Sequence, residues 1–367
     1  MDVWHGGRDA ALPGPEVSPF DRHPRLALAG ILFVSFLILA IVAETALRFL
    51  VNYRIDYYTY VTTSNSTHRY PYGEMHINSF GFPDVEWNLS DKRPRIGVIG
   101  DSVTAGVGAG AGYRYTDLLG QRFTDRVFFN FAGVGSDGVS GDEVVDKILT
   151  LVHRFGLKKI VYGMNLNDIL PTSSEGQDAL QDGPVIKVLD RVRADLDWLR
   201  GRSYLYNTLR TQAKLALVRL GYEAHGMEAF ELQPAKNERA IRDTAMRINE
   251  MARALREQGV GFCTIIFPYE MQISSEASQT YRAQGISWDP AFDRGLTQRK
   301  LLSYLDGSFK TVNGLNAFRE TANRSARVGE YFVYNLGDKL DWNHPNRAGH
   351  RVIANYLASQ APDCVTP

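Results

Sequence analysis

The stretch that decides the fold is Arg95–Val103, which reads Arg-Ile-Gly-Val-Ile-Gly-Asp-Ser-Val. Its first six residues form a short apolar run that ends at a glycine, a pattern typical of a buried strand in a parallel sheet. Similar runs follow at Val127–Phe131, Lys159–Gly163 and Gly261–Phe267, and helical patterns lie between them. Strands that alternate with helices predict an α/β fold, in which helices cover both faces of a mainly parallel sheet.

Composition excludes several classes of protein. The chain has 367 residues, with 41 Lys and Arg against 41 Asp and Glu, so its formal net charge is zero. Hydrophobic residues make up 44% and charged residues 22%, which is the ordinary globular range and excludes a mostly disordered chain or a fibre. The neutral balance argues against a nucleic-acid partner, since such proteins usually carry a basic excess.

Cysteine and histidine patterns indicate no cofactor. The two cysteines, Cys263 and Cys364, are too few for a disulfide framework, although one bridge between them stays open. Neither belongs to a cluster with metal-ligand spacing, and the histidines outside the candidate site show no such spacing either. We therefore expect no metal and no cofactor.

The N-terminal region contains a segment long enough to cross a membrane. Leu26–Ala43 is 18 residues without a charge, and at about 1.5 Å per residue such a helix spans most of the hydrocarbon core. We predict a transmembrane anchor over residues 26–51. A cleaved signal peptide is the alternative, but its apolar region is usually about 7–15 residues and its charged lead is shorter than the 25 residues present here.

Arginines on the two sides of this segment indicate its orientation. Arg8, Arg22 and Arg25 precede it, and Arg48 and Arg54 come at or after its end. Basic residues favour the cytoplasmic side of a membrane. The small excess before the segment places residues 1–25 in the cytoplasm and the large C-terminal part outside it, in the periplasm or at the cell surface.

The remaining chain divides by composition. Residues 52–92 are polar and aromatic, with scattered Gly, Pro and Asn, and we interpret them as an extracytoplasmic stalk or lead-in. Residues 93–360 carry the strand–helix pattern and form the predicted α/β domain. Residues 169–235 break that rhythm with Leu, Arg and Tyr at helical spacing, which predicts a helical insertion. Ordinary crossover helices are an equal alternative.

Polar residues that follow the strands form the candidate site, because ligands of parallel sheets bind beyond the carboxyl ends of the strands. Ser102 lies at a tight strand-to-helix turn, where a hydroxyl is exposed beside free backbone N–H groups. Gly135 follows the second strand and lets its backbone N–H approach a carbonyl. Asn167 follows the third strand and offers an amide donor to a developing oxyanion, with Asn165 as a substitute.

A fourth motif lies near the C-terminus. Asp341 and His344 are three residues apart on a loop that precedes a predicted helix over 348–358. At this spacing the carboxylate can orient the imidazole and stabilise its charged form. Pro345 stiffens the loop and makes a helix interior unfavourable there. A serine with an aspartate–histidine pair is the set of groups that nucleophilic acyl transfer requires.

These four motifs, in this order, resemble the SGNH, or GDSL-type, hydrolase family. The resemblance covers roughly residues 93–360 and implies a three-layer α/β/α, flavodoxin-like fold. It implies a Ser102, His344 and Asp341 triad with an oxyanion hole formed by Ser102, Gly135 and Asn167. The third motif departs from the family pattern, since Gly163 precedes Asn167 by four residues where the family usually separates the glycine from its Asn-Asp pair by one.

The resemblance and the anchor together imply a function. We expect a membrane-anchored serine esterase that acts on O-acyl, such as acetyl, esters of carbohydrate or cell-envelope glycan. One alternative is a polysaccharide O-acetyltransferase that works with a membrane-bound O-acyltransferase partner. Another is an inactive glycan-binding or assembly protein, because a fold does not guarantee activity.

Overall fold

A computed structural model describes residues 23–50, 65–70, 73–134, 143–169, 196, 199, 203–219, 230–283, 286, 288, 293–322, 326–333, 335–336 and 339–367. The chain divides into two compact units, Met1–Asn52 and Tyr53–Pro367. Only residues 23–25 of the predicted cytoplasmic tail are described. Gly135 lies outside the described residues.

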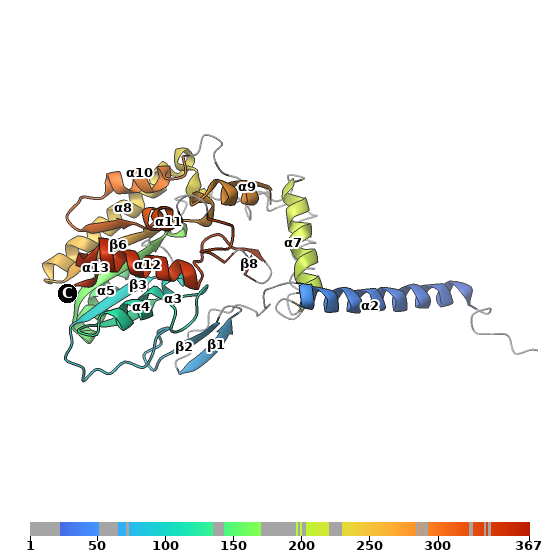
Figure 1. Ribbon diagram of the computed structural model, residues 1–367, viewed down its shortest axis with the longest axis horizontal. Coiled ribbons are helices and arrows are strands. Elements are labelled where there is room, and N and C mark those ends of the chain that lie inside the picture. Colours follow the sequence, from blue (N-terminus) through green and yellow to red (C-terminus); the bar gives the residue numbers. More distant parts are fainter. Residues whose placement is uncertain are drawn as a thin grey trace, which may run out of the picture. The chain divides into compact units, whose positions relative to one another are not determined.

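The first unit contains one long apolar helix, α2, at Pro24–Leu50 (Figure 1). Proline suits its first turn, where an N–H has no helical partner. The segment Pro24–Phe49 is long and apolar enough to cross a membrane, and its large apolar side chains are exposed in the structure. That exposure distinguishes it from the core helix of a soluble domain. The predicted apolar N-terminal helix is confirmed, and its length and composition fit a membrane span or a signal sequence.

The second unit is built on a five-stranded sheet (Figure 1). Its strands, in spatial order, are β4 (Val127–Ala132), β3 (Arg95–Gly100), β5 (Leu157–Asn165), β6 (Gly261–Phe267) and β7 (Lys310–Asn313). Every neighbouring pair is parallel. The predicted mainly parallel α/β sheet is confirmed.

Alternate residues of each strand enter two separate cores. On β3, Ile99 joins a core on one face of the sheet, whereas Ile96 and Val98 join a core on the other face. The first core is covered by α5 (Glu143–Phe155), α8 (Pro234–Glu257) and α10 (Leu296–Tyr304). The second is covered by α4 (Tyr115–Arg122), α11 (Gly314–Ala322) and α12 (Arg347–Gln360). The result is the expected three-layer α/β/α arrangement.

Two of the four predicted strands are longer than predicted. β3 and β6 have the predicted bounds, while β4 gains one residue and β5 extends to Leu157–Asn165. The edge strand β7 was not predicted, because only Val312 of its four residues is buried and no apolar run marks it. The predicted helix over 348–358 is present as the longer α12, and α8 is one of the helices expected between the strands.

Part of the predicted lead-in packs against the catalytic domain. Ser66–Tyr70 (β1) and Gly73–Ile77 (β2) form an antiparallel hairpin, and the loop after it reaches the sheet. Trp87 is buried and stacks on Phe129 of β4, with ring centroids 4.4 Å apart. The Asp84 carboxylate accepts hydrogen bonds from the Trp87 indole at 2.7 Å and from the Asn130 backbone at 2.8 Å. Residues 73–92 thus contribute to the core instead of only leading into it.

A disulfide joins the two cysteines. Cys263 in β6 bonds to Cys364 in α13 (Pro362–Val365), and their Cα atoms are 5.3 Å apart. The sequence did not decide whether this bridge forms, because the separation of two cysteines along the chain does not tell whether they are close in the fold. It ties the C-terminus to the sheet.

The predicted insertion over 169–235 lies largely outside the described residues. Within it the structure describes α7 (Tyr204–Arg219) and the short turn η4 (Phe230–Leu232), which leads into α8. The insertion therefore stays a prediction.

Candidate active site

The nucleophile candidate lies at the carboxyl end of β3, where the chain turns directly into a short helix. Asp101 is the N-cap of α3 (Ser102–Ala105), and its carboxylate accepts the Val103 N–H at 2.9 Å. Gly100 makes the turn possible, because a Cβ there would lie 2.3 Å from the Thr104 hydroxyl oxygen. Ser102 is half-buried, and as the first residue of a helix it presents a backbone N–H with no helical acceptor.

The acid–base loop, Asp341–His344, lies just before α12. The Oδ2 atom of Asp341 is 2.6 Å from the His344 Nδ1 atom. Its Oδ1 atom accepts the backbone N–H groups of Asn343 at 3.1 Å and His344 at 3.2 Å. Asp341 is 3% exposed and His344 is 9% exposed. One buried carboxylate thus fixes both the loop and the imidazole ring.

The loop brings His344 to Ser102, 242 residues earlier in the chain. The His344 Nε2 atom is 2.8 Å from the Ser102 Oγ atom. Because the ionised Asp341 only accepts hydrogen bonds, Nδ1 must carry the ring proton, and Nε2 is left to accept the serine proton. The three residues predicted as a triad therefore form one continuous hydrogen-bonded chain.

Backbone hydrogen bonds to the segment 331–333 hold the chain at His344 and just after it. The Val333 N–H donates to the His344 carbonyl at 2.9 Å, and the Asn346 N–H donates to the Tyr331 carbonyl at 2.9 Å. Gly108, in the loop after α3, packs closely against the Pro345 carbonyl, where a Cβ would lie only 2.2 Å from the oxygen. This close approach joins the nucleophile turn to the acid–base loop.

The two asparagines after β5 have different surroundings. Asn165 is fully buried; its Oδ1 atom accepts the Leu166 N–H at 2.8 Å, and its amide donates to Asp101 at 3.3 Å. Asn167, in the turn η1 (Leu166–Asp168), is half-buried, and its Oδ1 atom has no hydrogen-bond partner among the described residues. A donor for a substrate oxygen needs access, so Asn167 suits that role better than Asn165.

Two buried carboxyl groups lie beneath the nucleophile turn. Burial raises the pKa of Asp101, while hydrogen bonds from Val103, Asn165 and Asn167 and a charged His344 act in the opposite direction. Burial and the nearby Asp101 raise the pKa of Asp168 well above its ordinary value, although Asp168 accepts a hydrogen bond from Tyr162 at 2.8 Å. Burial therefore disfavours the ionised form of both carboxyl groups.

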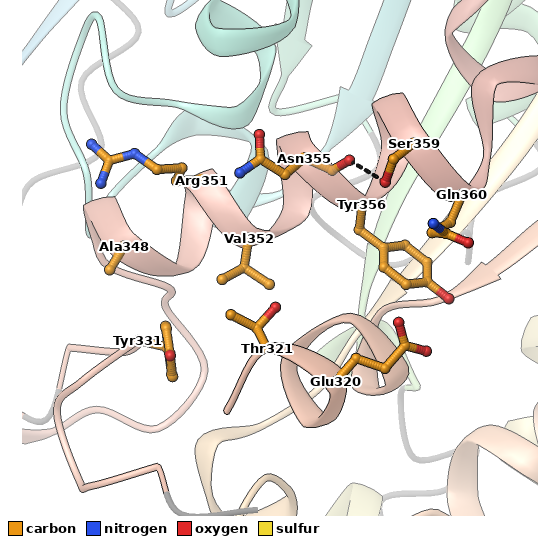
Figure 2. Close-up of a pocket in the computed structure, with 10 residues that line it drawn as sticks. All are labelled: Glu320, Thr321, Tyr331, Ala348, Arg351, Val352, Asn355, Tyr356, Ser359 and Gln360. Atoms are coloured by element: carbon orange, nitrogen blue, oxygen red, sulfur yellow. Dashed lines mark hydrogen bonds between the residues drawn. The ribbon is translucent and has the colours of Figure 1, made fainter. Parts of the chain in front are cut away.

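A hollow of about 370 Å³ lies elsewhere, between α11 and α12. Figure 2 shows Tyr331, Arg351 and Tyr356 among the side chains around it. None of the predicted site residues lines this hollow, so the chemistry described above is not assigned to it.

Two buried polar residues near the acid–base loop were missed by the sequence analysis. Glu270 follows β6 by three residues, and Tyr281 lies on α9 (Ser275–Ala283). Glu270 had a usable signal, since it is a polar residue just past the carboxyl end of a predicted strand. Tyr281 had none, because only the fold brings it to the loop.

Comparison with protein families identifies the chain. The model of the GDSL-like Lipase/Acylhydrolase family matches residues 96–357, which include Ser102 and the acid–base loop. The chain belongs to this family. It is therefore an ester-hydrolysing enzyme, and the resemblance found in the sequence is confirmed.

Solved structures similar to this GDSL family member share little sequence with it. A G-D-S-L family lipolytic protein from Veillonella parvula is 11% identical, with 73% of this chain and 98% of that chain covered and a TM-score of 0.36. An acylhydrolase-like protein from Bacteroides fragilis is 12% identical, with 76% and 94% covered and a TM-score of 0.38. A catalytic mutant of an acetylxylan esterase from Geobacillus stearothermophilus is 12% identical, with 73% and 94% covered and a TM-score of 0.35. No curated protein sequence matches the chain.

Metal ligands do not cluster in the part of the chain that the structure describes. There, no group of three or more His, Cys, Asp or Glu side chains is placed to hold a metal ion.

Proposed function

We propose that this GDSL family member is a membrane-anchored serine esterase with Ser102 as nucleophile, His344 as general base and acid, and Asp341 as the group that orients the histidine. The observation that supports this is the chain of two hydrogen bonds, 2.8 Å from Ser102 to His344 and 2.6 Å from His344 to Asp341. A serine hydroxyl is a weak nucleophile, and an adjacent oriented base is what activates it.

The proposed reaction proceeds through an acyl-enzyme. The Ser102 Oγ atom attacks the ester carbonyl carbon while His344 Nε2 takes the hydroxyl proton. The resulting imidazolium gives that proton to the leaving alcohol, and the acyl group stays on Ser102. Water then attacks the acyl carbon with His344 again as base, which releases the acid and restores the serine hydroxyl.

The proposed oxyanion hole combines three donors. These are the Ser102 backbone N–H, the Asn167 side-chain amide and the Gly135 backbone N–H. The free N–H at the start of α3 supports the first, and the half-buried position of Asn167, whose amide also donates to Asp101, supports the second. One such donor contributes on the order of 3 kcal/mol to the transition state. Gly135 comes from the sequence motif alone.

We further propose that α2 anchors the enzyme and that the catalytic domain lies outside the cytoplasm. The arginine excess before α2 supports this orientation. The Cys263–Cys364 disulfide supports it independently, because disulfides persist mainly in oxidising compartments. A reporter fused to the C-terminus should be active outside the cytoplasm, and activity inside would contradict this topology.

For the substrate we propose O-acyl esters of carbohydrate, because an anchored domain outside the cytoplasm meets cell-envelope or exported glycans. The full chain in detergent would be given an acetylated oligosaccharide, and released acetate and deacetylated sugar are expected. Release from p-nitrophenyl acetate without release from the sugar would contradict the carbohydrate assignment. Accumulation of a newly acylated acceptor sugar would show that the enzyme transfers the acyl group to a sugar instead of to water.

A serine-reactive fluorophosphonate probe tests the chemistry itself. Folded wild-type protein should be labelled at Ser102, and the Ser102→Ala variant should not. Peptide mapping of the labelled protein locates the adduct. An unlabelled wild type would contradict the proposed esterase and favour a protein that binds without catalysis.

A further inference from the structure

A buried carboxyl group contacts the acid–base loop from behind. Glu270 is 2% exposed and begins the short turn η5 (Glu270–Gln272) after β6. Its backbone N–H donates to the Trp342 carbonyl at 2.7 Å. Trp342 lies between Asp341 and His344, so this bond holds the middle of the loop. Burying a carboxyl group costs free energy unless the group is well hydrogen-bonded, so Glu270 needs hydrogen-bond partners here.

The Glu270 side chain has two partners on different elements. Its Oε1 atom accepts the Gly329 N–H at 2.6 Å, and its Oε2 atom is 2.5 Å from the Tyr281 hydroxyl. The Gly329 carbonyl in turn accepts a hydrogen bond from the Asn346 side chain at 3.1 Å. Glu270 therefore connects α9, the segment around Gly329 and the acid–base loop.

Tyr281 extends this contact to Asp341 itself. It is fully buried, and its hydroxyl lies 2.9 Å from the Asp341 backbone carbonyl. Its ring also meets the Trp342 ring edge-on, with centroids 6.3 Å apart. The Tyr281 hydroxyl and the Glu270 backbone N–H therefore contact two successive carbonyls of the loop, those of Asp341 and Trp342.

We propose that Glu270 is a positioning residue, which together with Tyr281 holds the Asp341–His344 loop so that the Asp341 carboxylate meets the imidazole. This inference rests on the proposed triad and extends it. Glu270 touches neither the substrate nor the reacting atoms. It acts through the backbone of the loop, where a displacement of about 1 Å is enough to cost as much as 10²-fold in rate.

The chemistry of the pair indicates which substitution should be tolerated. The single proton of the Tyr281 hydroxyl cannot be donated to both Glu270 and the Asp341 carbonyl. When Glu270 is protonated, it donates to the tyrosine oxygen, and the tyrosine proton is free for Asp341. Burial raises the pKa of Glu270 to about 7, with a further increase from Asp341 and opposing hydrogen bonds from Tyr281 and Gly329. Glutamine reproduces the protonated form, because its amide can donate to Tyr281 while its carbonyl accepts from Gly329.

The test compares Glu270→Ala, Glu270→Gln and Tyr281→Phe in the full chain in detergent. Hydrolysis of p-nitrophenyl acetate gives kcat and KM across pH, and thermal unfolding identifies the temperature range in which each variant is folded. Glu270→Ala should lower kcat about 10- to 100-fold with KM unchanged. It should also move the acidic limb of the kcat/KM profile to lower pH, because a displaced Asp341 stabilises the imidazolium less. Glu270→Gln should stay within about 5-fold of wild type, since the hydrogen bonds are retained.

A matched control is available on α8. Glu238 also pairs with a tyrosine, Tyr304, and with Lys300, but these contacts join α8 to α10. Glu238→Ala should leave kcat and the pH profile unchanged. The control shows whether loss of any carboxylate–tyrosine pair lowers activity.

The outcomes separate this inference from the proposed function. An active wild type with a Glu270→Ala variant of equal kcat and equal pH profile would overturn the positioning role alone, even if the melting temperature fell. A wild type that neither hydrolyses esters nor reacts with the fluorophosphonate would overturn the triad instead. If Glu270→Ala does not fold, Tyr281→Phe decides: a reduced kcat with the acidic limb at lower pH supports the proposal, and a wild-type profile overturns it.

Discussion

The nucleophile turn and the acid–base loop meet in one site but are held in different ways. At the turn, Asp101 caps the helix that Ser102 begins, and the Val107 N–H donates to the Ser102 carbonyl at 3.1 Å. The loop that carries His344 is instead held by groups from α9, η5 and the segment around Tyr331. The turn is capped by its own neighbour Asp101, whereas the loop adds contacts from several distant elements to the local bonds of Asp341. We therefore expect the loop to be more sensitive to substitutions at distant positions.

The largest expected effect comes from removing the nucleophile. Ser102→Ala should lower kcat on p-nitrophenyl acetate by about 10⁵-fold or more, because no acyl-enzyme can form. Since Asp101 supplies the helix cap, the turn should keep its structure and the melting temperature should stay close to that of wild type. Substantial turnover by this folded variant would show that the proposed nucleophile is wrong.

Asp341→Asn tests the loop with little change in shape. The asparagine carbonyl can still accept the two backbone N–H groups, but its amide faces Nδ1 and favours the wrong histidine tautomer. We expect kcat to fall about 10⁴-fold while the loop stays folded. A decrease of only a few-fold would mean that the carboxylate orients the ring without controlling its protonation.

The two asparagines after β5 sharpen the comparison at the turn. Asn167→Ala should lower kcat about 10²- to 10³-fold with KM little changed, because a donor to the oxyanion is lost. Asn165→Ala should mainly lower stability, since Asn165 caps η1 and donates to the buried Asp101. If Asn165→Ala lost kcat and Asn167→Ala kept it, the oxyanion role would move to Asn165.

The smallest expected effect is a pH dependence of stability that originates behind the loop. Glu270 has a pKa raised from its ordinary 4.5 to about 7 in the folded protein, so the folded state binds its proton more tightly than the unfolded chain. This contribution is fully present below pH 4.5 and is lost as the pH rises toward 7. Its size is at most about 3 kcal/mol in unfolding free energy.

Denaturant unfolding of wild type and Glu270→Gln across that pH range measures the effect. The glutamine variant should show a smaller decline in unfolding free energy, because it has no proton to lose. Glu238→Gln is the matched control, since Glu238 is partly exposed and its pKa is lowered by Lys300 and Tyr304. Equal slopes in wild type and Glu270→Gln would place the pH dependence elsewhere.

The same difference between the two regions explains what the sequence could predict. The apolar runs of β3 and β6 gave correct strand bounds, because a buried central strand needs apolar residues throughout. The edge strand β7 carries no such pattern. Ser102, Asp341 and His344 could be predicted as site candidates because each lies in a short motif next to a predicted element, and the fold brings their side chains together.

Residues that act through the fold were not found in this way. Asp84 and Trp87 lie in a stretch of mixed polar and aromatic residues without a strand or helix pattern, yet they pack on β4. Tyr281 is one tyrosine among 18, and only its proximity to Glu270 and the Asp341 carbonyl distinguishes it. Long-range packing, which periodicity does not record, decides these positions.

The Cys263–Cys364 bond has a consequence for how the enzyme withstands proteases. It closes a covalent ring that contains Asp341, His344, Glu270 and Tyr281, while Ser102 and Asn167 lie outside the ring. One cut between the two cysteines leaves both fragments attached to each other, so the histidine stays tethered to β6. On a gel such a nicked enzyme would migrate as a single species until a reductant separates its halves.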